Sequence, residues 1–388
     1  MNKKRLFLII GGGLFLYLIS TGVSFFAFSF FGGGGSRMTS PLPEELREEG
    51  FKVDINAPKT ESCPLNGQLY TKAEKEIWEK RRPLGVMIEN HKEARPQSGL
   101  AKADIVYEVV AEGGITRFLA IFYCGAAAKN LELAPVRSAR TYFVDWISEY
   151  DGLYNHVGGA GLCHDPTVDE RAKALCQIRE YGIKDLDQFG ISFPTCYRNP
   201  DRLDHPVATE HQMVCLSDNL YEIAEEKGWT NVDEEGVAWD EDFSPWKFKE
   251  GDELEDETAS FSAEFNFWRG YKEYLVRWDY DQASNSYLRF NGDKPHNDLD
   301  EGQLKAQNVV IQFSEETGPV DEHLHLLYQT KGDGKAIIFQ DGEVIKGTWK
   351  KKNRTSRTKF YDSQGAEVEF NRGQIWIEIL PVGTKVDY

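Results

Sequence analysis

An almost unbroken apolar run, Leu6 to Phe31, follows the charged start Met1 to Arg5 and constrains where the rest of the chain folds. A helix crosses a bilayer with about 20 apolar residues, so this run is long enough to span a membrane. Lys3, Lys4 and Arg5 favour a cytoplasmic start by the positive-inside rule. We therefore expect a cytoplasmic stub (1–5), a single-pass signal anchor (6–31) at the cell membrane, and an extracytoplasmic remainder.

A cleaved signal peptide is the alternative interpretation of this run. Its apolar core would span about 7 to 15 residues and end at a small-residue cleavage site. The segment Phe25 to Phe31 offers no such site, and no cysteine precedes Cys63, so a lipid acceptor is missing there too. These features favour an uncleaved anchor.

All six cysteines follow the apolar run. An even number in an oxidising compartment favours disulfides. No CxxC motif is present, which argues against the rival zinc site. Sequence order suggests one of the fifteen possible pairings: Cys163 with Cys176, Cys196 with Cys215, and Cys63 with Cys124.

Composition divides the remainder of the chain into a stalk and two domains. Gly32 to Gly35 and the prolines that follow indicate a flexible stalk over 32–60. Apolar periodicity lapses in the acidic stretch 239–260, which we interpret as a linker. The sequence thus predicts a first domain at 61–238 and a second at 261–388.

The expected elements indicate an α+β fold. In the first domain, apolar runs and capping residues predict a mixture of helices and strands. The helices are expected at 72–81, at 138–150 with Ser138 as the cap, from Asp165 with Pro166 at the first helical position, and from Ser217 to Gly228. The strands are expected at 83–89, 105–110 (a strand or short helix) and 115–123.

The second domain is predicted to be mainly antiparallel β structure. Asn291-Gly292 and Asp341-Gly342 are strong hairpin signals. Runs that alternate or are continuously apolar predict strands within 265–278, 286–290, 307–313, 324–329, 335–339, 343–349, 358–361 and 374–380.

Charge excludes one class of partner. The formal net charge is −18, whereas binding to a phosphate backbone requires a basic surface. We expect no nucleic-acid partner, and the acidity is typical of a solvated surface.

Two carboxylates, Glu108 and Glu112, are four residues apart and share a face whether the backbone is helical or extended. They could act as a general acid and base. The alternative is that they form buried ion pairs with Arg95 and Arg117, because such networks also gather acidic residues.

Arg137, Ser138 and Arg140 lie at the start of an expected helix. Free N–H groups at such a start favour anions, and two guanidinium groups would strengthen that preference. A carboxylate or phosphate ligand is therefore one hypothesis. The other is internal ion pairing, with Glu89, Glu108 or Asp145.

His156 precedes Gly158 and Gly159, so an imidazole lies beside backbone that a ligand can approach closely. No GxSxG motif accompanies it, which leaves serine hydrolysis unsupported. His323 and His325 share a strand face, but two histidines do not make a zinc site. The sequence indicates no metal and no cofactor.

Long stretches of the chain resemble a known family. These are RPLGVMIENHKEARPQSGLAKADIVYEVVAEGGITRF (82–118), PVRSARTYFVDWISEYDGLYNHVGGAG (135–161), YLRFNGDKPHNDLDEGQLKAQNVVIQF (287–313) and GTWKKKNRTSRTKFYDSQGAEVEFNRGQIWIEILP (347–381). They are similar to the YerB-like family of bacterial envelope lipoproteins. The resemblance implies an exported, membrane-tethered, two-domain protein of unestablished activity.

The family-like positions coincide with the polar residues found above. They are Arg95, Gln97, Ser98, Gly99, Glu108, Glu112, Arg117, Arg137, Ser138, Arg140, His156 and Gly158. Two departures exist. Family lipoproteins attach through an N-terminal cysteine, whereas this chain has a spanning run, and a PHN-like motif of the family reads Glu210-His211-Gln212 here.

Three functional hypotheses follow. The leading one is that Arg117, Arg137 and Arg140 bind an anionic cell-envelope ligand, such as a peptidoglycan fragment or a peptide carboxylate. The alternatives are a cell-wall enzyme that uses Glu108 or Glu112 with His156, and a scaffold that recruits an envelope protein. A cleft between the domains would suit a ligand, and its second-domain residues are expected to be His296, Asp298 and Asn308.

Overall fold

The computed structural model describes residues 57–251 and 261–388. The expected anchor, nearly all of the stalk and part of the acidic linker lie outside these residues. Within the two described ranges, no helix is long and apolar enough to cross a membrane. The described residues belong to one compact unit, Gly50–Tyr388.

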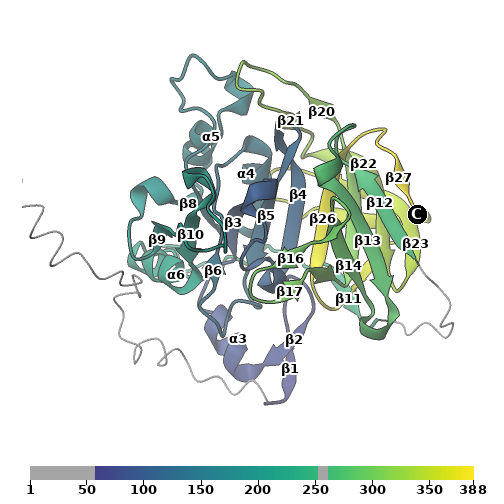
Figure 1. Ribbon diagram of the computed structural model, residues 1–388. Helices are drawn as coiled ribbons and strands as arrows, with labels where there is room; N and C mark the ends of the chain where they lie inside the picture. Colours follow the sequence, from purple (N-terminus) through teal and green to yellow (C-terminus); the bar gives the residue numbers. More distant parts are fainter. Residues whose placement is uncertain (1–56, 252–260) are drawn as a thin grey trace, which may run out of the picture. The chain divides into compact units, whose positions relative to one another are not determined.

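A ten-stranded sheet takes strands from both halves of the sequence (Figure 1). Its central strands are buried along nearly their whole length and are mostly apolar, as expected for strands that are covered on both faces. In sheet order they are β24 (Lys359–Asp362), β23 (Glu343–Lys351), β22 (Gly332–Gln340), β19 (Asn308–Ser314), β26 (Ile375–Pro381), β4 (Ile105–Glu112), β5 (Ile115–Phe122), β3 (Leu84–Glu89), β7 (Leu153–His156) and β8 (Lys184–Asp187).

Strand β26 joins the two halves of this sheet. It pairs in parallel with β4, with Glu378 opposite Glu108, and in parallel with β19 on its other side. Among β8, β7, β3, β5, β4, β26 and β19, only β5 runs in the opposite direction. The carboxyl ends of the six co-directional strands therefore meet at one edge of the sheet.

A second sheet of six strands belongs to the C-terminal half. It is antiparallel throughout and consists of β12 (Ser262–Asn266), β13 (Leu275–Asp281), β14 (Ser286–Asn291), β15 (Lys294–Pro295), β18 (Lys305–Ala306) and β27 (Val386–Asp387). The mixed α+β class is thus confirmed, and the antiparallel second half has two exceptions, β26 and β25 (Glu369–Asn371), which pair in parallel.

Small sheets complete the strand inventory of the described residues. They pair β1 (Lys59–Ser62) with β2 (Leu69–Thr71), β16 (Asn297–Asp298) with β17 (Gly302–Gln303), β20 (Glu316–Thr317) with β21 (Leu327–Tyr328), β11 (Lys247–Lys249) with β25 (Glu369–Asn371), and β10 (Met213–Leu216) with both β6 (Glu132–Leu133) and β9 (Cys196–Arg198).

Four α-helices are described: α3 (Lys72–Trp78), α4 (Thr141–Ile147), α5 (Ala174–Tyr181) and α6 (Ser217–Glu226). Helix α3 begins with a capping box of Thr71 and Glu74, which satisfies two N–H groups reciprocally.

The starts of the other three helices correct the predictions. Helix α4 begins after Arg140, not at Ser138. Ser217 is the first residue of α6 rather than its cap, because its hydroxyl accepts a hydrogen bond from the Leu131 N–H. Asp165 accepts hydrogen bonds from the N–H and hydroxyl of Thr167. That local turn competes with a helix start, so α5 begins only at Ala174.

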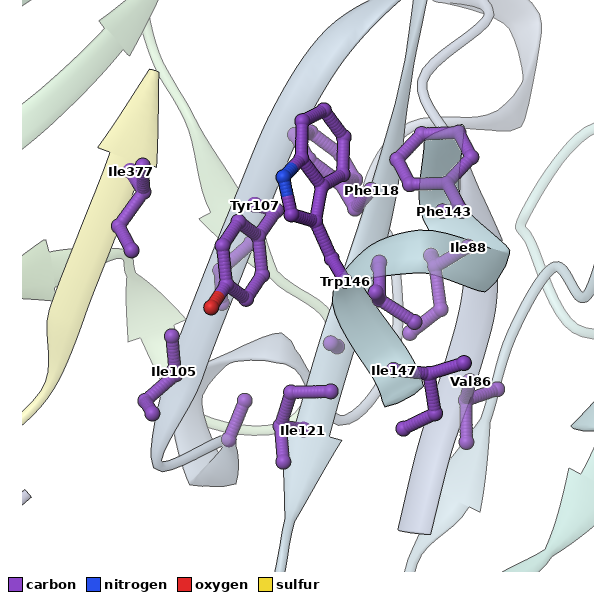
Figure 2. Close-up of a cluster of buried hydrophobic side chains, with 14 of the residues drawn as sticks. Val86, Ile88, Ile105, Tyr107, Phe118, Ile121, Phe143, Trp146, Ile147 and Ile377 are labelled. Atoms are coloured by element: carbon purple, nitrogen blue, oxygen red, sulfur yellow. The ribbon is translucent and has the colours of Figure 1, made fainter. Parts of the chain in front are cut away.

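The core beside α4 is aromatic and aliphatic (Figure 2). The Trp146 ring stacks on Tyr107 of β4, with centroids 5.5 Å apart. Ile147 packs where Gly85 of β3 has no side chain, since a Cβ there would lie 2.5 Å from the Ile147 Cδ1. This close approach fixes α4, and therefore Arg140 before it, against the sheet.

Three disulfides are present, Cys63–Cys124, Cys163–Cys176 and Cys196–Cys215. They confirm the pairing favoured by sequence order. Cys196 and Cys215 lie opposite each other on β9 and β10, and Cys63–Cys124 ties the segment before β2 to the end of β5.

Candidate functional site

The candidate site is a group of charged side chains at the edge where β3, β4 and β7 end. Glu89, Glu112 and His156 are the last residues of these three strands. Ligands of sheets with parallel strands commonly bind at the carboxyl edge. The sheet topology thus brings together residues that the sequence analysis had selected singly.

The segment 136–140 runs along this edge and carries the arginines. The Arg137 N–H donates to the Met87 carbonyl of β3, the Val157 N–H donates to the Arg137 carbonyl, and the Ala139 N–H donates to the Gly158 carbonyl. Backbone bonds on both sides therefore hold the segment between the ends of β3 and β7.

Glu112 is the centre of the arginine group, which we define as Arg117, Arg137 and Arg140. It pairs with Arg140 Nε through Oε1 and with Arg117 Nη2 through Oε2, the latter at 3.4 Å. Arg117 also donates to the Ser138 carbonyl at 2.8 Å. Sequence reasoning allowed for internal pairing of these arginines, and the structure places Glu112, rather than Glu108, between two of them.

Charges within the group perturb one another. Burial alone would raise the pKa of Glu112, but the charges of Arg117 and Arg140 outweigh it and hold this pKa below its usual range. Burial lowers the pKa of the Arg117 guanidinium, and the neighbouring charges of Arg140 and Arg137 lower it further. Arg117 therefore lies in an environment that is already rich in positive charge.

Arg137 extends the group toward a pair of histidines. Its Nε lies 3.2 Å from Glu89 Oε1, and the other oxygen of Glu89 lies 2.7 Å from His211 Nδ1. The rings of His91 and His211 stack with centroids 4.7 Å apart. Sequence reasoning missed His91 because its partner is distant in the chain, and it noted His211 as a family departure.

His156 and Gly158 lie beside the group but are buried. The His156 Nε2 is 2.9 Å from Asp185 Oδ1, and its Nδ1 is 2.8 Å from the Gly158 carbonyl. Gly158 has a φ of +55°, a conformation that suits glycine. Phe189, which is 77% exposed, packs over this glycine.

Glu108 lies elsewhere, in a fully buried cluster between the halves of the chain. It pairs with Arg289 of β14, which also pairs with Glu378 of β26 at 2.6 Å; all three side chains are wholly buried. Glu108 also accepts hydrogen bonds from Thr116 and Asn90. Arg289 and Glu378 were missed, because nothing in the sequence pairs them with Glu108.

The second-domain residues expected to line a cleft surround this buried cluster or lie apart from it. His296 contacts Arg289 and Gln97. Asp298 accepts from the Ala101 N–H, and Asn308 donates to the Asn371 carbonyl. Across residues 57–251 and 261–388, no hydrogen bond or ion pair joins these three to Arg137 or His156.

Arg95 is also removed from the arginine group. It donates to the side chain and carbonyl of Asn90 and to the Glu273 carbonyl. Burial lowers the pKa of the Arg95 guanidinium to about 10, and the neighbouring Tyr274 and Glu108 oppose this shift.

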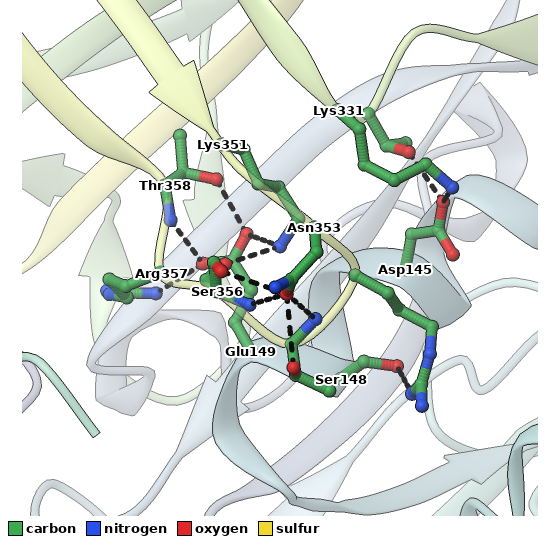
Figure 3. Close-up of polar contacts among 12 residues, drawn as sticks. Asp145, Ser148, Glu149, Lys331, Lys351, Asn353, Ser356, Arg357 and Thr358 are labelled. Atoms are coloured by element: carbon green, nitrogen blue, oxygen red, sulfur yellow. Dashed lines mark hydrogen bonds and ion pairs between the residues drawn. The ribbon is translucent and has the colours of Figure 1, made fainter. Parts of the chain in front are cut away.

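Two cavities flank α4. One, of about 400 Å³, lies at its C-terminal end between Tyr181, Trp239, Phe243 and Arg354, and one of about 320 Å³ lies beside Tyr142, near its start, and Thr330. Glu149 lines the first cavity, is buried, and pairs with Lys351 and Arg357 of the second half (Figure 3). None of the three arginines of the group lines either cavity.

Comparisons with known proteins match most of the described residues. Residues 69–230 match the family "Protein of unknown function (DUF3048) N-terminal domain", and residues 264–377 match its C-terminal domain. The chain is 30% identical over 321 residues to "Putative lipoprotein YerB" of Bacillus subtilis (strain 168), covering 82% of this chain and 86% of the relative. The crystal structure of YerB protein from Bacillus subtilis is similar, with a TM-score of 0.67, 27% identity, and coverage of 85% of this chain and all of that one.

Proposed function

The chain belongs to the DUF3048 family, and we propose that it is a membrane-anchored extracytoplasmic protein that binds an anionic cell-envelope ligand at Arg117, Arg137 and Arg140. The YerB-like resemblance seen in the sequence is confirmed by the relative and by its crystal structure.

Three observations support the location. The apolar run at 6–31 is long enough for a membrane anchor. The relative from Bacillus subtilis is named a lipoprotein. All six cysteines form disulfides, which persist in oxidising compartments outside the cytoplasm.

The observation that carries the ligand hypothesis is the surplus of positive charge. Among the described residues, the three arginines make ion pairs with only two carboxylates, Glu89 and Glu112. Glu89 also faces His211. In a protein with a net charge of −18, such a local surplus favours a bound anion.

The ligand we propose is a carboxylate of a peptidoglycan stem peptide. Guanidinium groups bind carboxylates in a bidentate geometry, and Arg137 keeps 28% of its side chain exposed for such a contact. The Ser138 hydroxyl has no hydrogen-bond partner within the described ranges and lies between the arginines in sequence, so it can donate to the same anion.

The test uses the full-length protein in detergent and a soluble stem peptide with a free terminal carboxylate. Isothermal titration calorimetry compares the parent with Arg137→Gln and with Arg277→Gln. Arg277 is a matched control, because it pairs with one carboxylate, Asp279, and its side chain is 30% exposed. We expect Arg137→Gln to weaken binding about tenfold or more, as loss of a charged hydrogen bond does, and Arg277→Gln to leave it unchanged.

A second ligand separates charge recognition from general affinity. The same peptide with an amidated terminus should bind the parent as weakly as the free acid binds Arg137→Gln. Equal affinity of the parent for both peptides, or equal effects of the two arginine substitutions, would overturn the proposal. Mass spectrometry of peptidoglycan incubated with the parent tests the enzymatic alternative, which predicts released fragments.

A further inference from the structure

The described residues contain three groups of side chains whose donor atoms lie close enough together to hold a metal ion. Two of them include the cysteines of Cys63–Cys124 and Cys163–Cys176, which are already bonded as disulfides. The third consists of His91, Glu93 and His211, and its donor atoms lie within 4.8 Å of one another.

We propose that His91, Glu93 and His211 form a binding site for one divalent transition-metal ion of the zinc class. Two imidazoles and one carboxylate match the donors that Zn²⁺, Co²⁺ and Ni²⁺ prefer, whereas Ca²⁺ and Mg²⁺ prefer oxygen alone. The site is separate from the arginine group and does not depend on the anion proposed there.

The strongest support is the orientation of His211. Its Nδ1 lies 2.7 Å from a carboxylate oxygen of Glu89. A carboxylate accepts hydrogen bonds, so Nδ1 is the donor in this contact, and Nε2 is the ring nitrogen left to bind a metal ion. Metal-binding histidines usually have such an outer carboxylate on the second ring nitrogen. Nε2 has no hydrogen-bond partner among residues 57–251 and 261–388.

His91 and Glu93 supply the adjustable side of the site. They lie at a short 3₁₀ turn (Lys92–Ala94), and the Glu93 N–H donates to His91 Nδ1 at 3.3 Å. Glu93 is exposed and His91 is partly exposed, whereas His211 is buried. Donor atoms around tetrahedral zinc are about 3.3 Å apart, given Zn–N bonds of about 2 Å. A turn of the His91 ring out of its stack, with a rotation of Glu93, brings both donors to the fixed His211.

Three protein donors leave a fourth position for water or for a ligand. Glu89 links His211 to the arginine group, since its two oxygens face His211 and Arg137. A metal ion here would therefore lie on the same edge of the sheet as Arg137.

The experiment measures metal binding directly. The full-length protein, made without a histidine tag, is titrated with chelator-buffered Zn²⁺, and Co²⁺ is followed by visible absorption of the four-coordinate ion. The parent should bind one equivalent. His91→Ala should lose this binding, and Glu89→Gln should weaken it by about 10–100-fold, the usual effect of removing an outer carboxylate.

His205→Ala is the control, because His205 is another exposed histidine with a carboxylate neighbour, Asp204, and it should bind like the parent. His91→Ala is suited to the test because a partly exposed side chain can be removed with little effect on folding; circular dichroism checks this. Binding of Zn²⁺ by His91→Ala with parental affinity, or no stoichiometric binding by the parent, would overturn the proposal. Neither result bears on the peptide titrations.

Discussion

Individual residues at the junction of the two halves show how burial changes acid chemistry. Glu108, Arg289 and Glu378 are wholly buried and place two carboxyl groups on one guanidinium. Burial raises the pKa of Glu378 well above its usual 4.5, and the charge of Glu108 raises it further. This shift favours the neutral form of Glu378, and Arg289 also forms an ion pair with Glu108.

This division predicts unequal effects of the same substitution. Glu378→Gln keeps a neutral side chain whose oxygen can still accept from Arg289 and Trp278, so the free energy of unfolding at pH 7 should change by less than about 1 kcal/mol. Glu108→Gln breaks a buried ion pair and should lower the free energy of unfolding by about 3 kcal/mol or more. Urea denaturation of both variants measures the difference.

The pH dependence of stability provides a further check that the pKa of Glu378 is raised. The folded-state pKa of Glu378 lies above 4.5, so folding takes up a proton, and its contribution to stability declines as the pH rises above 4.5. Glu378→Gln should thus gain stability relative to the parent over that range. A larger loss for Glu378→Gln than for Glu108→Gln would contradict the assignment.

Single residues of the site were predictable where the partner was near in sequence. Arg137, Ser138, Arg140 and Gly158 were found from a short stretch of sequence. The pairing of Glu89 with the arginines was among the alternatives, but its contact with His211, which lies in a distant 3₁₀ turn, was not foreseen. Arg289 was missed because its partner Glu378 lies on a distant strand. Only the folded chain brings such charges into contact.

At the level of secondary structure, the three disulfides close loops of different lengths. Cys63–Cys124 closes a loop with a sequence separation of 61, and Cys163–Cys176 one of 13. A longer closed loop restricts the unfolded chain more strongly.

Removing these disulfides singly should therefore have graded effects. Replacing both cysteines by alanine should lower the free energy of unfolding by about 4 kcal/mol for Cys63–Cys124 and about 3 kcal/mol for Cys163–Cys176, on the loop-entropy relation. Denaturant titration of the two double variants tests the order. An equal or reversed order would show that local packing outweighs the loop effect.

The elements themselves were well predicted where an apolar run was continuous. Strands β3, β5 and β19 lie close to their expected ranges, and Asp341-Gly342 joins β22 to β23 as expected. The run expected at 265–278 is instead divided between β12 and β13 by a turn that includes Gly270, which has a φ of +94°. Helix starts were less predictable, because Asp165 and Ser217 bond elsewhere.

Across the whole molecule, buried ion pairs connect the halves a second time at the end of α4. Glu149 is bonded to Lys351, Arg357 and Thr358 (Figure 3). Burial alone would raise the pKa of Glu149, but the charges of Lys351 and Arg357 outweigh it, so this pKa is lowered below 4.5.

The protein should accordingly lose stability in acid. A carboxyl group with a lowered folded-state pKa stabilises the fold above pH 4.5, and this contribution is lost as the pH falls below that value. At pH 7, Glu149→Gln should lower the free energy of unfolding by about 3–5 kcal/mol. The difference in this free energy between the variant and the parent should shrink below pH 4.5. Urea titrations between pH 7 and pH 3 measure both.

Glu367→Gln is the control for this comparison, because Glu367 makes a partly exposed ion pair with Lys359. This substitution should lower the free energy of unfolding by less than about 1 kcal/mol. Parallel stability curves for the parent and Glu149→Gln throughout the acid range would contradict the role of Glu149.

The position of β26 near the C-terminus also determines when the ten-stranded sheet can be completed during synthesis. Strand β4 has an unpaired edge until Ile375–Pro381 arrives to lie between it and β19. Because a chain is synthesised from its N-terminus, the charged edge residues are made long before the strand that closes the sheet. A product cut short upstream of residue 375 would keep an open apolar edge, which invites aggregation and proteolysis. The fold in this way makes survival of the protein conditional on complete synthesis.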